Sequence, residues 1–335
     1  MMGATSEAET KSVSSDRPLP AWIAADPASL RLLELVRKAA DLRSTVLILG
    51  ESGTGKDQLA QLLHFLGPRR HAPVVTIACA SLPAELLESE LFGYERGAFT
   101  GAFQSKPGRL ELAGAGTLVL NEIDALSLSL QAKLLRVIEE RSFERLGGRS
   151  AIHIEARLVA ITNVDLEQAV ARHSFREDLY YRLFVLPLTI PPLRERRGDI
   201  LPLAEHFLRE GDRDHSRRLS PAVQRALEVY AFPGNVRELR NFLSRARMWS
   251  ERDELQLDDF PSALQERSAP QPEQTLEELE KKHIAAVLHR FRGRKQAAAA
   301  ALGITPKTLL EKRRRYGLDL PWTDRIPPGV LRPKS

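Results

Sequence analysis

The chain carries the stretch Gly50-Glu51-Ser52-Gly53-Thr54-Gly55-Lys56 between an apolar, β-branched run at 45–49 and a helical pattern at 57–65. The spacing G-x-x-x-x-G-K between a strand and a helix is typical of a phosphate-binding loop. Its glycines let backbone N–H groups turn toward phosphate oxygens, and the helix start adds a positive dipole end. Lys56 is placed to reach the β- and γ-phosphates. The stretch therefore predicts a nucleoside triphosphate site.

Three more short apolar runs, at 74–78, 116–120 and 156–161, are separated by helical patterns such as the one at 28–42. Strands that alternate with helices favour a parallel α/β sheet. From about residue 199 to 264 the periodicity is helical with no strand signal, which predicts a small helical lid. The fold class we expect is an α/β P-loop sheet with a helical lid, followed by an all-α domain.

Composition limits the class of protein. A length of 335 residues with 43% hydrophobic residues allows two or three domains with real cores. The single cysteine, Cys79, excludes a disulfide within the chain and fits a reducing cytoplasm, and its apolar surroundings favour a small buried residue. No run approaches the roughly 18 apolar residues of a membrane span, and the N-terminus lacks the apolar core of a signal peptide. We expect a cytoplasmic protein without a membrane partner.

Positive charge is concentrated near the C-terminus. Between residues 281 and 318 eleven lysines and arginines stand against one acidic residue, a local net charge of +10, whereas the whole chain carries +5. Such a localised field favours double-stranded DNA as a partner, with a solvated basic helix as the alternative.

The same segment has the pattern of a helix-turn-helix. An Ala-rich run at 296–302 precedes Gly303 and Ile304, Thr305 is a good N-cap, and Pro306 suits the first position of a second helix that ends at Gly317. The second helix would enter the major groove, with Thr308 and Lys312 as base readers and the arginines on phosphates. The residues that we expect to contact DNA are Arg294, Lys295, Thr305, Lys307, Thr308, Lys312, Arg313, Arg314 and Arg315.

These patterns divide the chain into six segments. We expect a disordered polar tail at 1–20, the α/β subdomain at 21–198, the lid at 199–264, a Pro-containing linker at 265–273, the helix-turn-helix domain at 274–318 and a flexible tail at 319–335.

A second phrase, Gly97-Ala98-Phe99-Thr100-Gly101-Ala102, follows the phosphate-binding loop by about 40 residues. Its glycines and small residues would let a hairpin project from a helix with Phe99 and Thr100 at the tip, the alternative being a turn with Phe99 in the core. Together the two phrases resemble the AAA+ activators of sigma-54 RNA polymerase, the bacterial enhancer-binding proteins, over roughly residues 20–318. This resemblance implies that residues 97–102 contact the sigma-54 factor within RNA polymerase and that the C-terminal domain is Fis-like.

The resemblance also exposes two departures. The apolar run 118–120 ends in Asn121-Glu122, where the family has Asp-Glu, the Asp helping to hold Mg²⁺ and the Glu activating water. Asn121 keeps an oxygen but lacks the charge that a hard cation prefers, so it is a weak metal contact. Ala78 stands where the family has an Asn that hydrogen-bonds the catalytic Glu. The acidic Asp57 after the loop is common in the family. We expect ATP to bind and hydrolysis to be slow or conditional.

The remaining nucleotide contacts are implied by the resemblance alone. Asn163 corresponds to the residue that contacts the γ-phosphate or the water, and Arg237 in the segment 232–239 to the lid arginine on the phosphates. In the segment 175–183, Arg176 and Arg182 correspond to arginine fingers that reach a neighbouring subunit's site, the alternative being surface ion pairs. Catalysis completed between subunits implies a homo-oligomer, from a dimer to a hexamer.

The function favoured by these patterns is an ATP-dependent transcription activator that binds upstream DNA and remodels sigma-54 polymerase. The alternative is an ATP-binding, hydrolysis-impaired DNA-binding regulator or a partner subunit in a mixed ring. A metabolic P-loop kinase fits poorly, because it explains neither the 97–102 phrase nor the helix-turn-helix. Since about 20 residues precede the ATPase region, we expect no receiver domain there.

Overall fold

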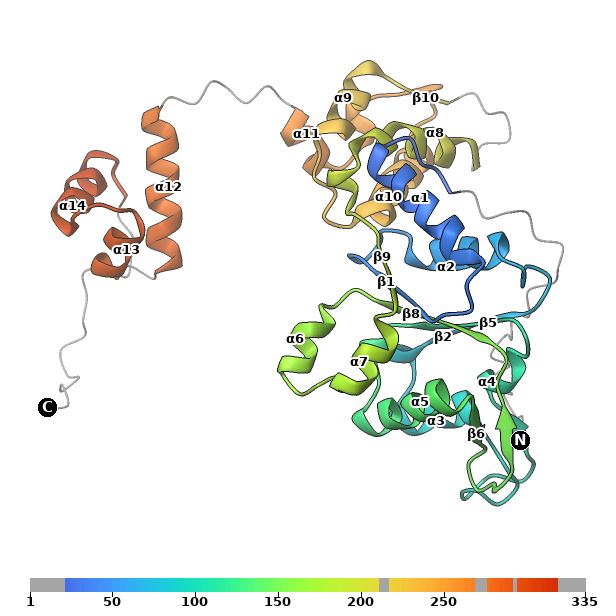
Figure 1. Cartoon of the computed structure of the whole chain (residues 1–335). Coiled ribbons are helices and arrows are strands. Elements are labelled where there is room, and N and C mark those ends of the chain that lie inside the picture. Colours follow the sequence, from blue (N-terminus) through green and yellow to red (C-terminus); the bar gives the residue numbers. More distant parts are fainter. Residues whose placement is uncertain (1–21, 211–216, 269–275, 292–293, 319–335) are drawn as a thin grey trace, which may run out of the picture. The chain divides into compact units, whose positions relative to one another are not determined.

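A computed structural model of the chain describes residues 22–210, 217–268, 276–291 and 294–318 (Figure 1). The chain forms two compact units that divide between Ser268 and Ala269. The tails expected at 1–20 and 319–335 and residues 269–273 of the expected linker lie outside the described residues.

The first unit is built on a five-stranded parallel sheet in the order β2-β5-β8-β1-β9. The strands are β1 (Val46–Leu49), β2 (Val74–Ala78), β5 (Thr117–Asn121), β8 (Arg157–Thr162) and β9 (Leu186–Thr189). Four of them confirm the predicted runs to within one residue at either end. The fifth, β9, was not predicted. It contains Pro187, which lowers the strand signal and is tolerated because β9 lies at the edge of the sheet.

Helices cover both faces of this sheet (Figure 1). One face packs against α1 (Pro27–Ala40) and α2 (Lys56–Leu66), whose buried residues include Val36 and Leu63. The other face packs against α3, α5 and α7 through residues such as Leu91, Leu134 and Leu179. The bounds of these three helices are α3 (Ala84–Phe92), α5 (Leu128–Glu140) and α7 (Glu177–Leu183). Two short helices belong to the same part of the chain, α4 (Arg109–Leu112) and α6 (Leu166–Ala171). The predicted α/β class is therefore confirmed.

Two short antiparallel hairpins extend from this layer. β3 (Gly93–Tyr94) pairs with β4 (Lys106–Pro107), and β6 (Ser142–Glu144) pairs with β7 (Ala151–His153). The first hairpin begins directly after α3, which confirms the prediction that the 97–102 phrase projects from a helix. Short 3₁₀ helices lie at η1 (Cys79–Ser81), η2 (Ile123–Ala125), η3 (Leu193–Glu195), η4 (Arg197–Asp199) and η5 (Leu257–Asp259).

The lid packs its helices around a separate apolar core that includes Phe207, Leu227 and Leu243. Its helices are α8 (Ile200–Glu210), α9 (Pro221–Val229), α10 (Asn235–Trp249) and α11 (Ser262–Ser268). The expectation of a lid without strands was wrong in detail, because β10 (Arg218–Leu219) pairs in parallel with β11 (Glu254–Leu255). Two residues per strand are too few to show a periodicity.

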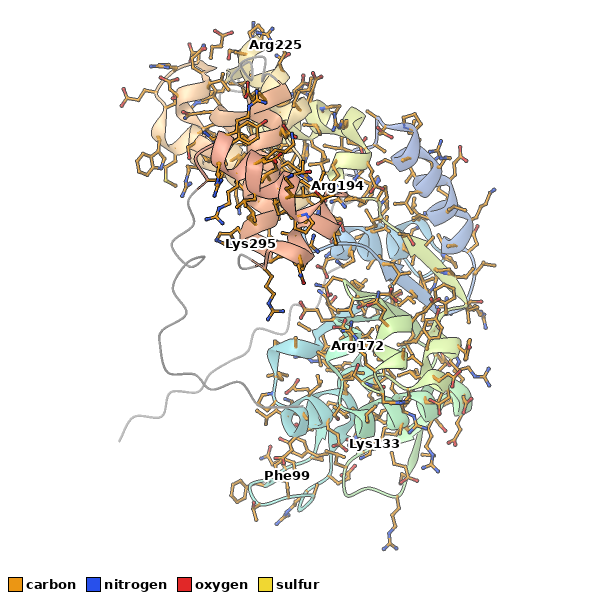
Figure 2. All side chains as sticks on the ribbon, turned by 90° about the vertical axis from the view of Figure 1, so that its left-hand side faces the viewer. Phe99, Lys133, Arg172, Arg194, Arg225 and Lys295 are labelled. Carbon is orange, nitrogen blue, oxygen red and sulfur yellow. The ribbon has the colours of Figure 1, made fainter. Side chains whose placement is uncertain are left out.

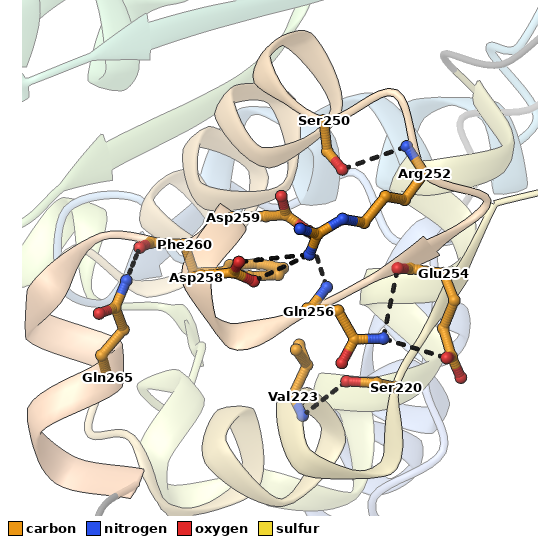
Figure 3. A network of polar contacts seen from close by, with 10 residues as sticks. All are labelled: Ser220, Val223, Ser250, Arg252, Glu254, Gln256, Asp258, Asp259, Phe260 and Gln265. Carbon is orange, nitrogen blue, oxygen red and sulfur yellow. Dashed lines mark hydrogen bonds and ion pairs between the residues drawn. The ribbon is translucent and has the colours of Figure 1, made fainter.

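Polar contacts stabilise the end of the lid (Figure 3). Arg252 donates to Asp258 at 3.1 Å, and the Gln256 N–H donates to Asp259 Oδ2 at 2.7 Å. The Gln265 side chain donates to the Phe260 carbonyl at 2.6 Å. Residues 265–268, which we expected to begin the linker, therefore continue α11 instead.

The second unit contains α12 (Leu276–Arg290), α13 (Lys295–Ala301) and α14 (Pro306–Arg315) around Leu288, Ala298 and Leu309. The Thr305 hydroxyl accepts from the Thr308 N–H at 3.2 Å, as a helix N-cap does. Gly303 at φ 66° and Gly317 at φ 61° take the left-handed conformation that turns and helix ends require. The predicted helix-turn-helix is confirmed.

Within the described part of the chain, no helix is both long and apolar enough to cross a membrane.

Candidate nucleotide-binding site and nucleic-acid interface

A cavity of about 320 Å³ opens beside the phosphate-binding loop, under the lid. Nine of its lining residues were predicted from the sequence: Ser52, Gly53, Gly55, Lys56, Asp57, Asn121, Glu122, Asn163 and Arg237. Four others were missed: Gln58, Phe207, Val236 and Arg240. The lid residues among them carry no phosphate-binding signature, so only the fold reveals their place. The cavity joins the loop, the carboxyl edge of the sheet and the lid in one site.

The loop holds its shape through backbone angles that favour glycine. Gly55 at φ 103° forms the N-cap of α2, so the free N–H groups of that helix start at the loop. Gly53 at φ 79° lies against the lid, where an added Cβ would stand 2.4 Å from the Gly234 carbonyl oxygen. A side chain at position 53 would therefore push the loop and the lid apart.

We expect Gly53→Ala to lower nucleotide affinity by at least about tenfold, because backbone strain of about 1–3 kcal/mol adds to the clash with Gly234. Isothermal titration with ATP measures the change. Gly114→Ala is the matched control: Gly114 also has positive φ, at 50°, but no described atom lies within 4 Å of the position of its Cβ. Equal losses in both variants would mean that the contact with the lid is unimportant.

The Lys56 ammonium lies across the loop. Its Nζ donates to the carbonyls of Gly50 at 2.7 Å and Glu51 at 2.9 Å. Burial is the main cause that lowers the pKa of this amine, opposed by the charge of Asp57. Phosphate oxygens are stronger acceptors than these carbonyls, so the geometry suits a lysine that binds a nucleotide phosphate.

Glu51 ties the loop to the lid side of the site. Its carboxylate accepts from Arg194 at 2.6 and 2.9 Å and from the Asn235 amide at 3.1 Å. The hydrogen bonds from Arg194 are the largest cause that lowers the pKa of Glu51 to about 2. On the lid, Arg237 donates to the Ser52 hydroxyl at 3.1 Å. The first half of the loop is thus held by groups near or in the lid.

Asn121 ends β5 at the edge of the cavity. Its amide donates to Asp57 Oδ1 at 2.9 Å, and Glu122 follows at φ 57°. In the register of β2 and β5, Ala78 stands directly opposite Asn121, so the two departures from the expected pattern are neighbours. Mg²⁺ takes oxygen ligands from one or two protein groups together with phosphates, and the Asp57 and Asn121 oxygens fit that donor set.

Cys79, which follows Ala78 at the end of β2, is buried. Burial raises the pKa of its thiol to about 12. This confirms the expectation of a small buried residue rather than a nucleophile.

A second cavity of about 300 Å³ adjoins the first and shares Gln58, Phe207, Val236 and Arg240 with it. It was not predicted. The buried Nε1 of Trp22 and the buried Nε of Arg196 in its lining have no hydrogen-bond partner among the described residues. Buried donors without partners are uncommon, and both atoms are shielded from solvent, so they do not face the open part of the cavity.

Arg176 and Arg182 do not line either cavity at the phosphate-binding loop. Arg176 pairs with Asp178 at 2.6 Å and Arg182 with Glu139 at 3.0 Å, and their side chains are 40% and 58% exposed. Both belong to the surface around α7. The structure therefore leaves them available to another molecule rather than to this chain's own site.

The 97–102 loop presents an aromatic ring. The Gly97 N–H donates to the Ala102 carbonyl at 2.9 Å and closes the loop, whose residues Gly97 and Gly101 have positive φ. Phe99 is 47% exposed and packs edge-on against Tyr94 with the ring centroids 5.0 Å apart. Figure 2 shows its side chain at the tip of the loop. The alternative of a Phe99 packed in the core is wrong.

The second hairpin supports this loop and was missed. The Glu95 N–H donates to the Leu146 carbonyl at 3.0 Å, and Arg145 pairs with Glu95 at 3.0 Å and with Glu111 at 2.7 Å. The adjacent pair Gly147-Gly148 is a turn signal that could have revealed this hairpin.

On α14 the predicted DNA-contacting residues separate into two groups. Lys307 and Arg314 are exposed, as are Arg294 and Lys295 near the start of α13. Arg313 is only 8% exposed and its Nε donates to the Leu318 carbonyl at 2.9 Å, so its assignment to phosphate contact was wrong. The side chain is part of the core of this unit because it lies on the same helix face as Leu309.

The other group is paired within the unit. Lys312 forms an ion pair with Glu280 at 2.5 Å and Arg315 forms one with Glu277 at 2.8 Å. The hydroxyls of Thr305 and Thr308 lie 2.8 Å apart at the N-cap. Lys312 and Thr308, expected to read bases, thus have partners inside the unit.

We expect Arg313→Ala to destabilise the C-terminal unit by about 1–3 kcal/mol, because the Leu318 carbonyl loses its donor and the buried stem leaves a gap. Hydrogen exchange of the α13 and α14 amides in the full chain measures this local stability. Arg314→Ala, an exposed change, should stay within about 0.5 kcal/mol of the unchanged protein. Similar exchange in both variants would contradict a structural role for Arg313.

Comparisons with known families cover nearly the whole described chain. Residues 22–189 match the sigma-54 interaction domain, residues 194–277 the AAA+ ATPase lid domain, and residues 275–316 the Fis family of bacterial regulatory proteins.

Individual proteins with similar sequences are also regulatory proteins. The alginate biosynthesis transcriptional regulatory protein AlgB of Pseudomonas aeruginosa is 47% identical over 299 residues, which cover 87% of this chain and 66% of that protein. The regulatory protein AtoC of Escherichia coli is 41% identical over 308 residues, covering 88% of this chain and 67% of that protein. The chain spans between 56% and 66% of the length of the first three relatives.

Solved structures of NtrX from Brucella abortus are similar as well. The complex with ADP has a TM-score of 0.67 and 29% identity, covering 90% of this chain and 70% of that one. The complex with ATP has a TM-score of 0.66 and 31% identity, covering 88% and 69%.

Proposed function

Because the chain belongs to the family of sigma-54-dependent transcriptional activators, with an ATP-binding AAA+ domain, a lid and a Fis-type helix-turn-helix, we propose that it is an ATP-dependent activator. It binds upstream DNA through its C-terminal unit and remodels sigma-54 RNA polymerase through the 97–102 loop. The observation that carries this proposal is Phe99, held half-exposed at a loop tip on the same unit as a complete phosphate-binding loop.

The nucleotide site supports ATP as the ligand. The N–H groups at the start of α2 and the Lys56 ammonium bind the phosphates, and Arg237 approaches them from the lid. The adjoining cavity, lined in part by Trp22 and Ile23, takes the base. Asp57 and Asn121 would hold Mg²⁺, which would neutralise charge on the phosphates. Glu122 orients the attacking water and accepts its proton, and Asn163 contacts the γ-phosphate or that water.

The active assembly is a ring. Arg176 and Arg182 lie away from this chain's own cavities and are exposed, which suits fingers that stabilise phosphate charge in a neighbouring copy. A site that needs a second copy makes turnover depend on protein concentration. We propose a homo-oligomer up to a hexamer.

Transcription with purified components tests the proposal. Sigma-54 RNA polymerase on a supercoiled template should form open complexes only when this chain and hydrolysable ATP are both present. Lys56→Ala is the matched control, since it keeps the 97–102 loop and removes the phosphate contact. Open complexes formed without ATP, or equally well with Lys56→Ala, would contradict an ATP-driven activator.

The second candidate is a regulator that binds ATP and DNA but hydrolyses little, alone or in a mixed ring. The adjacent Asn121 and Ala78 favour it, because they remove the charge and the amide that would otherwise surround Glu122. It predicts ATP binding without open complexes in the same assay.

A further inference from the structure

The exposed face of α14 is formed by Lys307, Leu310, Glu311 and Arg314. Their spacing of i, i+3, i+4 and i+7 places them on one stripe of the helix. The buried residues Leu309, Arg313 and Tyr316 lie on the opposite side, against the rest of the unit. A partner can reach this face, and the exposed side chain of Arg315 beside it, without unfolding the unit.

The cations of α14 differ in whether they have a partner within the unit. Lys312 and Arg315 are held by carboxylates of α12, and Tyr316 donates to the same Glu280 that pairs with Lys312, at 2.5 Å. Of the exposed cations of α14, Arg315 is paired with Glu277, whereas Lys307 and Arg314 have no ion pair among the described residues. They are therefore the cations of α14 best placed to meet phosphates.

Glu311 is the single acidic residue of α14, and it stands between these two cations on the exposed face. No ion pair engages its carboxylate within the described part of the chain. A carboxylate that approaches DNA is repelled by the phosphates unless a base donates a hydrogen bond to it. In the major groove the base donors are the amino groups N4 of cytosine and N6 of adenine, and a carboxylate is suited to accept from cytosine N4.

We propose that Glu311 determines sequence specificity by accepting a hydrogen bond from the N4 amino group of a cytosine in the major groove. Lys307 and Arg314 on either side hold the helix to phosphates and offset the charge of Glu311. This inference rests on the proposed DNA-binding function. Glu311 takes the place of Lys312 and Thr308 as the base reader, because the side chains of those two residues have partners within the unit.

Selection of duplexes from a random library by the full chain tests the inference. The selected sites of the unchanged protein should contain a C·G pair at one position of each half-site. Glu311→Ala should reduce the preference at that position about tenfold and leave the other positions unchanged. Glu311→Gln should shift it toward A·T, because an amide pairs best with adenine N6 and N7.

Glu277→Ala is the matched control, since it removes one carboxylate from the same unit but lies on α12. It should raise affinity for all sequences alike without changing the selected bases. If Glu311→Ala selects the same sites as the unchanged protein, or if Glu277→Ala shifts the sites in the same way, the inference is wrong. If the unchanged protein retains duplexes without any sequence preference, the inference alone is wrong; if it retains no duplex, the proposed DNA-binding function fails as well.

Discussion

Phe99→Ala is expected to abolish activation of sigma-54 polymerase while leaving ATP binding unchanged. The ring is half-exposed at the loop tip and one edge is braced by Tyr94, so it is presented in a fixed orientation. Loss of an aromatic anchor at the centre of an interface costs about 2–4 kcal/mol, on the order of a hundredfold in affinity. Residues 97–102 are not among those that line the nucleotide cavity, so the effect on ATP should be small.

Open-complex formation and ATP titration on the same preparation measure the two effects. Phe103→Ala is the matched control: it removes a second phenyl ring that is 84% exposed and lies just outside the loop closed by Gly97 and Ala102. We expect its loss of activation to be much smaller. Equal losses in both variants would indicate a general apolar surface, and a normal Phe99→Ala protein would contradict the role of the loop.

Asn121→Asp is expected to raise ATP turnover about 10- to 100-fold, the usual range for a group that tunes a bound metal. A carboxylate at the end of β5 supplies the negative charge that Mg²⁺ prefers. The same change places a second carboxylate about where the Asn121 amide now donates to Asp57 at 2.9 Å. Without a cation the two charges repel, so the variant should be less stable than the unchanged protein in chelator and should recover with Mg²⁺ and nucleotide.

Steady-state hydrolysis and thermal unfolding, each with and without Mg²⁺, measure these effects. Asn121→Ala is the control that removes the hydrogen bond without adding charge, and it should not raise turnover. A rate for Asn121→Asp within twofold of the unchanged protein would show that position 121 is not limiting. Ala78→Asn, directly opposite in the sheet register, is then the next variant to measure.

Much of the fold could be predicted because local sequence carried strong signals. The phosphate-binding loop lies between β1 and α2, where both glycine and helix patterns are unambiguous. β9 could not be predicted, since Pro187 weakens a strand whose pairing depends on β1, far away in the chain. The hairpin β6–β7 has three residues per strand, too few for alternation to be read.

The residues of the site that face a ligand could be predicted from sequence motifs. The residues that hold other parts of the protein in place were harder to predict. Lys56, Glu122 and Asn163 line the cavity as expected. Arg194 shows the limit: it binds Glu51, and nothing in its local sequence distinguishes it from a solvent-exposed arginine. Arg313 is buried on the helix face of Leu309, and its charge concealed that place in the pattern. Such roles depend on which distant element packs nearby.

The hydrogen bonds from Arg194 and Asn235 to Glu51 have a thermodynamic consequence for nucleotide exchange. The loop takes its shape from contacts within the protein, so a nucleotide does not have to order the loop as it binds. Little conformational entropy is then lost on association, and little is regained on departure. Exchange of ADP for ATP should therefore proceed without local unfolding of the loop.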